Sequence, residues 1–170
     1  NIDIDKIYSS DLQRAFHTAE AIAKIKNMQV TAKKELREIF AGDWEGMPFL
    51  DIPQKTNPEI WDDWANNMNG ETRPQNGESV NELFKRIYRA LEEIAKENDG
   101  KKVVVACHGT PIKVMTKWTR DASLCDIYKT PWAANASVTK FVYENGKFTL
   151  EKENDCSHLG NLKTFIPNGV

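Results

Sequence analysis

The order of strand-like and helix-like segments predicts an α/β fold with a mainly parallel central sheet. Segments with apolar residues at helical spacing alternate with short apolar runs. One of these runs, Val103–Ala106, is apolar on both faces, which is typical of a buried parallel strand. At 170 residues with 40% hydrophobic content, the chain has the size of one domain, and we expect a single domain over residues 1–170.

The first half begins with a short strand at residues 4–8. Ser10 and Gln13 have the spacing of a capping box, so we predict that Ser10 caps a helix that runs to about Lys26. A second short strand is expected at residues 29–31. Because strands and helices alternate here, the segment fits the start of a parallel sheet.

Residues 41–76 differ in composition from the rest of the chain. The segment holds four of the seven prolines and three of the five tryptophans. Prolines at this density favour short helices separated by loops. We therefore expect an excursion over one end of the core, placed to cover a substrate.

The second half holds the clearest element signals. Ser79 and Glu82 form a second capping box, and Asn145-Gly146 suits the type I′ turn of a hairpin. Helices are therefore expected from 79 to about 98 and from 111 to 118, and strands at 103–106, 137–143 and 147–150.

Composition excludes several classes of protein. The net charge of −2 gives no footprint for nucleic acid or for an anionic membrane, and no apolar run approaches the roughly 20 residues of a membrane span. The three cysteines fit neither a disulfide framework nor a zinc site, which favours a reducing compartment, the cytoplasm. No nucleotide-binding loop, serine-hydrolase elbow or metal-ligand spacing occurs, so we expect neither metal nor cofactor.

Two strand-to-helix junctions are expected at the same edge of the sheet, where α/β folds bind ligands. Arg14 lies near the start of one helix, and a guanidinium there either binds phosphate or is a solvated surface group. His108 with Gly109 lies at the other junction, and it is either an anion-binding imidazole or a histidine capped by its loop. His17 and His158 are interpreted as structural.

Glu38 is a third candidate. A carboxylate in a loop rich in apolar residues can have a raised pKa, which suits a general acid. Acidic residues in loops are usually solvated, and the chain has 25 of them, so position alone does not single out Glu38.

Taken together, several segments resemble the histidine phosphatase superfamily, which has the phosphoglycerate mutase-like fold. They are Ile7-Tyr8-Ser9-Ser10-Asp11-Leu12-Gln13-Arg14-Ala15 with Thr18-Ala19, Leu36-Arg37-Glu38-Ile39, Gly42-Asp43-Trp44-Glu45-Gly46, Gly77-Glu78-Ser79, Val103–Gly109, Asn135-Ala136-Ser137-Val138 and Asn154-Asp155-Cys156-Ser157-His158-Leu159. The resemblance implies a three-layer α/β/α sandwich and metal-independent phosphoryl transfer through a phosphohistidine. Its implied roles are phosphoryl binding by Arg14, protonation of the leaving oxygen by Glu38, and donation to the phosphoryl oxygens by His108 with Gly109.

The sequence departs from the family pattern at the attacking histidine. In the family this residue lies in an Arg-His-Gly motif after a first strand that is central to the sheet, and these 170 residues contain no such motif. Further N-terminal residues, a fragment, or a pseudoenzyme that has lost the strand would each account for this; we favour the first two. We expect these residues alone to be inactive, and to fold poorly or to pair with another chain, because a sheet without its central strand has unpaired backbone groups.

The expected function is hydrolysis of a small phosphomonoester by the phosphatase branch of the family. Phosphoglycerate mutase activity, an isomerase reaction, is one alternative. A non-catalytic module that binds phosphorylated ligands or another protein is the other. The expected partner is a small phosphorylated metabolite, without nucleic acid or membrane, and a homodimer remains open.

Overall fold

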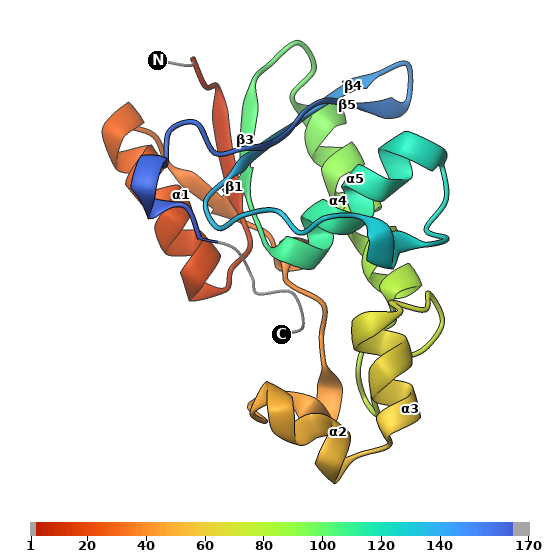
Figure 1. Ribbon diagram of the computed structural model, residues 1–170. Helices are drawn as coiled ribbons and strands as arrows, with labels where there is room; N and C mark the ends of the chain where they lie inside the picture. The colour runs from red at the N-terminus through yellow and green to blue at the C-terminus, as the bar shows by residue number, and fades with distance from the viewer. Residues whose placement is uncertain (1–2, 165–170) are drawn as a thin grey trace.

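The computed structural model describes residues 3–164 (Figure 1). Strands and α-helices are joined by short 3₁₀ turns, and a π-helical turn at Asp62–Asn66 follows α3. In chain order the elements are β1 (Lys6–Ser9), α1 (Gln13–Lys26), β2 (Val30–Ala32), α2 (Ile52–Lys55), α3 (Pro58–Trp61), α4 (Val80–Glu97), β3 (Val103–Ala106), α5 (Gly109–Asp121), β4 (Val138–Glu144) and β5 (Lys147–Asp155). The expected α/β order is confirmed.

The central sheet is parallel, as predicted. β1 lies between β2 and β3, and Tyr8 is in register with Thr31 on one side and with Val105 on the other. β4 and β5 form a separate antiparallel pair. At the turn of this hairpin Asn145 and Gly146 have φ angles of 52° and 74°, so the predicted type I′ turn is confirmed.

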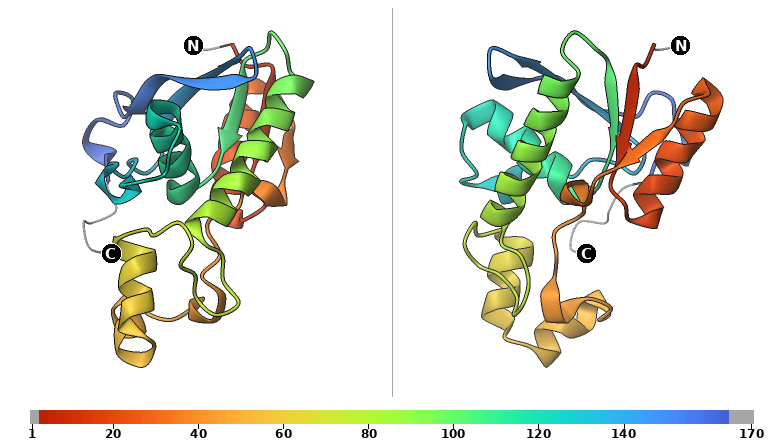
Figure 2. Two further views of the ribbon diagram at one scale, coloured as in Figure 1. Left: turned by 90° about the vertical axis from the view of Figure 1, so that its right-hand side faces the viewer. Right: turned by 180° about the vertical axis from the view of Figure 1, so that it is seen from behind.

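Consecutive residues of β1 bury opposite faces of the sheet, which produces the layers. Ile7 packs against Ala19 and Ala23 of α1. Tyr8 packs on the other face, against a cluster that includes Ala90 and Ile94 of α4. Figure 2 shows the sheet between α1 on one side and α4 on the other. The three-layer arrangement expected from the family resemblance is therefore present.

The long helix α4 begins as the sequence predicts. The Glu82 N–H donates to Ser79 Oγ at 3.3 Å, and the Ser79 N–H donates back to Glu82 Oε2 at 2.9 Å. The buried stripe of α4 includes Leu83 and Ile87, which pack with α5 and with Phe148 of the hairpin. This cluster is the largest part of the core.

The prediction for Ser10 was wrong. Helix α1 begins at Gln13 with Leu12 as its N-cap, and no side chain caps it. Ser10 is fully buried, and its hydroxyl accepts the Leu12 N–H at 3.2 Å while also contacting His108. The capping pattern failed because the backbone is still extended at Leu12, with ψ of 129°.

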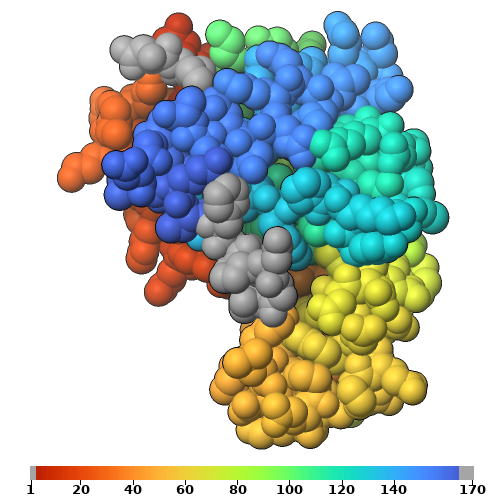
Figure 3. All heavy atoms as spheres, viewed as in Figure 1, coloured from red at the N-terminus to blue at the C-terminus, as the bar shows by residue number. Residues whose placement is uncertain are grey.

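Residues 41–76 form short helices and turns, as expected, and Figure 3 shows them protruding from the rest of the molecule. Trp44, Trp61 and Trp64 make a small core of their own, with edge-on ring pairs at 5.6 Å. We call residues 40–43 and 75–78, where the excursion joins the core, the neck. In the neck Gly42 has a φ of 57°, and a Cβ there would lie 2.2 Å from the Gln75 carbonyl oxygen, so only glycine fits.

Strand β3 differs from its sequence pattern. All four of its residues are half-buried rather than buried. Within the described residues β3 pairs only with β1, and β4 pairs only with β5, so the two sheets are not hydrogen-bonded to one another. A strand that is apolar on both faces is partly exposed here because one of its edges has no neighbouring strand. Among the described residues no helix is long and apolar enough to cross a membrane.

Candidate active site

The two strand-to-helix junctions meet, as predicted, at the carboxyl end of the sheet. Because β1 and β3 are parallel neighbours, Ser10 after β1 and His108 after β3 lie side by side. His108 Nε2 and Ser10 Oγ are 2.8 Å apart. His108 is 7% exposed and is the N-cap residue of α5, so it lies beside the free N–H groups of that helix. Gly109 is the first residue of α5.

The surroundings of His108 keep its imidazole neutral at pH 7. Burial lowers the pKa of His108 to about 4, and the positive charges of Arg14 and Arg86 act in the same direction, against a smaller opposite effect of Asp11. A neutral imidazole still donates one N–H. A dianionic phosphoryl group placed beside it would favour the protonated ring, because opposite charges attract.

Glu38 reaches the same helix end from residues 37–41, which have no regular structure. One carboxyl oxygen, Oε1, accepts the Ile39 N–H at 2.9 Å. The other, Oε2, accepts the N–H of Thr110 in the first turn of α5 at 3.3 Å. Burial raises the pKa of Glu38, although these two N–H groups and the Arg14 charge act against the rise. The carboxyl group therefore holds its proton to a higher pH than an exposed glutamate does.

Arg14 completes the group. It projects from the first turn of α1 and is exposed, and within the described residues its guanidinium has no hydrogen-bond or ion-pair partner. It nevertheless lies near enough to lower the pKa values of both Glu38 and His108 by its charge. The structure thus brings the three predicted side chains together, with the donors of Arg14 available to an anion.

Comparison with known proteins agrees with this arrangement. Residues 1–156 match the model of the histidine phosphatase superfamily, branch 1. The chain belongs to this superfamily.

Relatives of this chain include proteins whose names state an activity. It is 33% identical over 158 residues to phosphoglycerate mutase-like protein 4 of Arabidopsis thaliana, covering 92% of this chain and 66% of that protein. It is 31% identical to phosphoserine phosphatase 1 of Hydrogenobacter thermophilus, covering 94% and 74%. The solved structure of Bacillus stearothermophilus YhfR superimposes with a TM-score of 0.86 at 28% identity, covering 93% and 77%. The chain spans just under two thirds of the Arabidopsis protein and 42% of a Mycobacterium tuberculosis relative.

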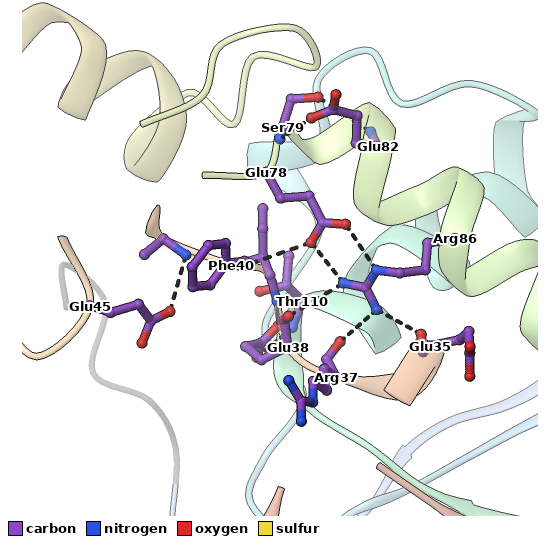
Figure 4. A network of polar contacts seen from close by, with 12 residues as sticks. Glu35, Arg37, Glu38, Phe40, Glu45, Glu78, Ser79, Glu82, Arg86 and Thr110 are labelled. Carbon is purple, nitrogen blue, oxygen red and sulfur yellow. Dashed lines mark hydrogen bonds and ion pairs between the residues drawn. The ribbon is translucent and has the colours of Figure 1, made fainter. Parts of the chain in front are cut away.

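Three further residues around the candidate site were not predicted from the sequence as site residues. Ser10 contacts His108, and Arg86 and Glu78 form a network around the main chain beside Glu38 (Figure 4). Glu78 belongs to the Gly77-Glu78-Ser79 segment that contributes to the family resemblance, which was its only signal. Arg86 had no sequence signal, because no local pattern shows that a helix side chain will bond to a loop about 50 residues earlier in the chain.

The other two histidines are exposed, whereas Cys107 directly precedes His108. His17 is exposed, and His158, also exposed, has Nε2 3.0 Å from the Ala136 carbonyl oxygen. Burial raises the pKa of Cys107 to about 12, which makes its thiol a poor nucleophile. Within residues 3–164 no three His, Cys, Asp or Glu side chains are grouped closely enough to hold a metal ion.

Proposed function

We propose that the protein is a metal-independent phosphatase that hydrolyses a small phosphomonoester through a phosphohistidine intermediate. The observation that carries this proposal is the position of Glu38. Its half-buried carboxyl group has a raised pKa and is bonded at the start of α5, next to His108 and within electrostatic reach of Arg14. An acid, an arginine and an anion-binding helix end at one place suit phosphoryl transfer.

Each side chain has a defined role in this reaction. Arg14 binds the phosphoryl oxygens through its fork of donors, and His108 donates an N–H to them. A histidine nitrogen attacks phosphorus, the phosphorus–oxygen bond of the ester breaks, and the leaving oxygen takes the proton of Glu38. Glu38, now a carboxylate, then takes a proton from water as that water attacks the phosphohistidine, which releases phosphate and restores the acid.

The attacking histidine is proposed to come from an Arg-His-Gly segment joined to this chain. His17 and His158 are both exposed, and His108 already has the donor role. The half-buried β3, which has one strand neighbour among the described residues, offers an edge on which a further strand can pair. Such a strand would end at the same edge of the sheet as β1 and β3 if it ran parallel to them, and so would place its histidine facing His108.

The substrate is proposed to be a small phosphomonoester, with phosphoserine as the first compound to test. The name of the Hydrogenobacter relative supports this choice. The excursion at residues 41–76 is proposed to cover the substrate, because the neck joins the chain directly after Glu38. The proposed location of the protein is the cytoplasm.

The test uses the protein with its upstream coding sequence, assayed with EDTA present on p-nitrophenyl phosphate, phosphoserine and 3-phosphoglycerate. We expect phosphate release and acid-labile phosphate trapped on histidine. Transfer of the phosphoryl group to a second hydroxyl without release would identify a mutase instead. If turnover does not exceed that of His108→Ala on any compound, the chain is a non-catalytic module and the proposal fails.

A further inference from the structure

We propose that Arg86, held by Glu78, is a positioning residue that fixes the main chain of residues 35–40 so that the Glu38 carboxyl group faces the leaving oxygen. This inference rests on the proposed function, because it concerns the acid of that reaction. It concerns two residues that do not touch the reacting atoms themselves. Their contacts are shown in Figure 4.

Arg86 reaches from the second turn of α4 to the main chain of Glu38 and of the residues before it. Its Nη1 donates to the carbonyl oxygens of Glu35 at 2.6 Å and of Arg37 at 3.1 Å. Its Nη2 lies 3.4 Å from the Glu38 carbonyl oxygen. One guanidinium therefore contacts three carbonyl groups within four residues, and its remaining donors are left for Glu78.

Glu78 holds that fork in place. Its two carboxyl oxygens accept from Arg86 Nε at 2.9 Å and Nη2 at 2.7 Å, a bidentate pair. Glu78 also bonds to Phe40 twice: Oε2 accepts the Phe40 N–H at 3.3 Å, and the Glu78 N–H donates to the Phe40 carbonyl at 2.8 Å. The Trp64 indole N–H donates to the Glu78 carbonyl at 2.9 Å, which extends the network into the excursion.

The network replaces secondary structure that this segment lacks. Residues 37–41 belong to no helix or strand, and Arg86 supplies donors to two of their carbonyl groups, those of Arg37 and Glu38. The Glu38 carboxyl group is itself held by two main-chain N–H groups, one of which, that of Ile39, belongs to the same segment. A shift of this segment therefore moves the acid relative to α5, and a misplacement of about 1 Å can lower a rate about a hundredfold.

The kinetic test compares variants in the full protein that shows turnover. Arg86→Met removes all the bonds of the fork, and Arg86→Lys retains a charge without the fork. Arg86→Met combined with Glu78→Gln removes both charges, so that no net charge change remains. Arg89→Met is the matched control, because Arg89 is exposed one turn along the same helix.

We expect all three Arg86 variants to lose about 10- to 100-fold in kcat on phosphoserine, a poor leaving group, with KM within about twofold. On p-nitrophenyl phosphate, which needs little help from an acid, the loss should stay within about threefold. Arg89→Met should match the parent on both. Equal losses on the two substrates, or restoration of phosphoserine turnover by Arg86→Lys, would overturn the positioning role.

Amide hydrogen exchange tests whether the network fixes Glu38 and does not require catalytic turnover. Exchange at the Ile39 and Thr110 amides, which bond to the Glu38 carboxyl group, should quicken about tenfold or more in Glu78→Gln and in Arg86→Met but not in Arg89→Met. Unchanged protection at both amides contradicts the proposal. If Arg86→Met does not fold, Glu78→Gln, which conserves size, gives both readouts. Should the parent protein lack phosphatase activity, the proposed function fails, and exchange still decides whether the network fixes Glu38.

Discussion

Two regions that flank α5 treat buried polar groups in opposite ways. At the start of α5 the polar side chains are bonded: the buried His108 to Ser10, and the half-buried Glu38 to the main chain of Thr110 and Ile39. Farther along the same helix, where it faces the β4–β5 hairpin, Lys113 and Thr116 are at least as buried as His108. Within the described residues neither side chain has a hydrogen-bond or ion-pair partner.

The second region is built around a buried ammonium group. Lys113 is 3% exposed, and its Nζ lies 4.2 Å from the ring centroid of Trp132, a cation–π contact. It lines a cavity of about 10 Å³ together with Thr116 and Glu153, but Glu153 is paired with Arg120. Burial lowers the pKa of Lys113 to about 8.

The two regions show that polar side chains in the interior have different effects when they are hydrogen-bonded and when they are not. Bonds at the start of α5 fix side chains in one geometry, which is what a reacting site requires. The polar groups that face the hairpin cost stability, because desolvation is not repaid by partners in these residues. Thr139 of β4 also lines this cavity. Within residues 3–164, β4 pairs with β5 alone.

The largest effect we predict is at Glu38. In the full protein, Glu38→Gln should lower kcat on phosphoserine by about 10² to 10⁴, because the leaving oxygen loses its proton donor. On p-nitrophenyl phosphate the loss should be far smaller. A plot of kcat against leaving-group pKa measures the difference, with Glu45→Gln, an exposed neck-side carboxylate, as the control. Equal losses on both substrates would remove Glu38 from the acid role.

His108 gives the next effect, in stability against pH. Its pKa is about 4 in the folded protein and 6.5 for the model group, so between these values the unfolded chain binds more protons. The His108 contribution is therefore complete above pH 6.5 and is lost as pH falls to 4, by about 3 kcal/mol. Urea unfolding of the parent and of His108→Asn over pH 4 to 7 checks this. The free energy of unfolding should rise more steeply with pH in the parent than in the variant. Identical slopes against pH would contradict the burial of an uncharged ring.

Lys113 should change stability with pH in the same direction as His108, but at higher pH. Its pKa is about 8 when folded and 10.5 for the model group, so folding is opposed while the group is charged, and stability rises as pH goes from 8 to 10.5. In the full protein, Lys113→Met should raise the free energy of unfolding at pH 7 by about 1–3 kcal/mol, after about 1 kcal/mol is subtracted for the lost contact with Trp132. Lys117→Met, on the same helix, is the control. Destabilisation by Lys113→Met would mean that a partner neutralises the ammonium group.

The sequence predicted a feature when the interacting residues are close to one another along the chain, and less well when they are far apart. The capping box of Ser79 and Glu82 and the turn at Asn145-Gly146 were predictable because the partners are near in sequence. Arg14, Glu38 and His108 were predicted as site residues because each occupies a segment that resembles the family, and the parallel pairing of β1 with β3 brings two of the junctions together. The capping pattern at Ser10 misled because the chain stays extended to Leu12, and the contact of the Ser10 hydroxyl with His108, 98 residues away, had no local signal. No local pattern describes such long-range contacts, nor the reach of Arg86 or the burial of Lys113.

The smallest predicted effects test the comparison most directly, because the same kind of change should have opposite signs in the two regions. Ser10→Ala removes a bonded hydroxyl and leaves His108 without its partner, so it should destabilise by about 1–3 kcal/mol. Thr116→Val removes a buried hydroxyl that has no partner in residues 3–164 and keeps the branched shape, so it should be neutral or stabilising by up to about 1 kcal/mol. Urea midpoints of both variants against the parent measure the two signs. If Thr116→Val destabilises as much as Ser10→Ala does, its hydroxyl is bonded too, and the contrast between the two regions does not hold.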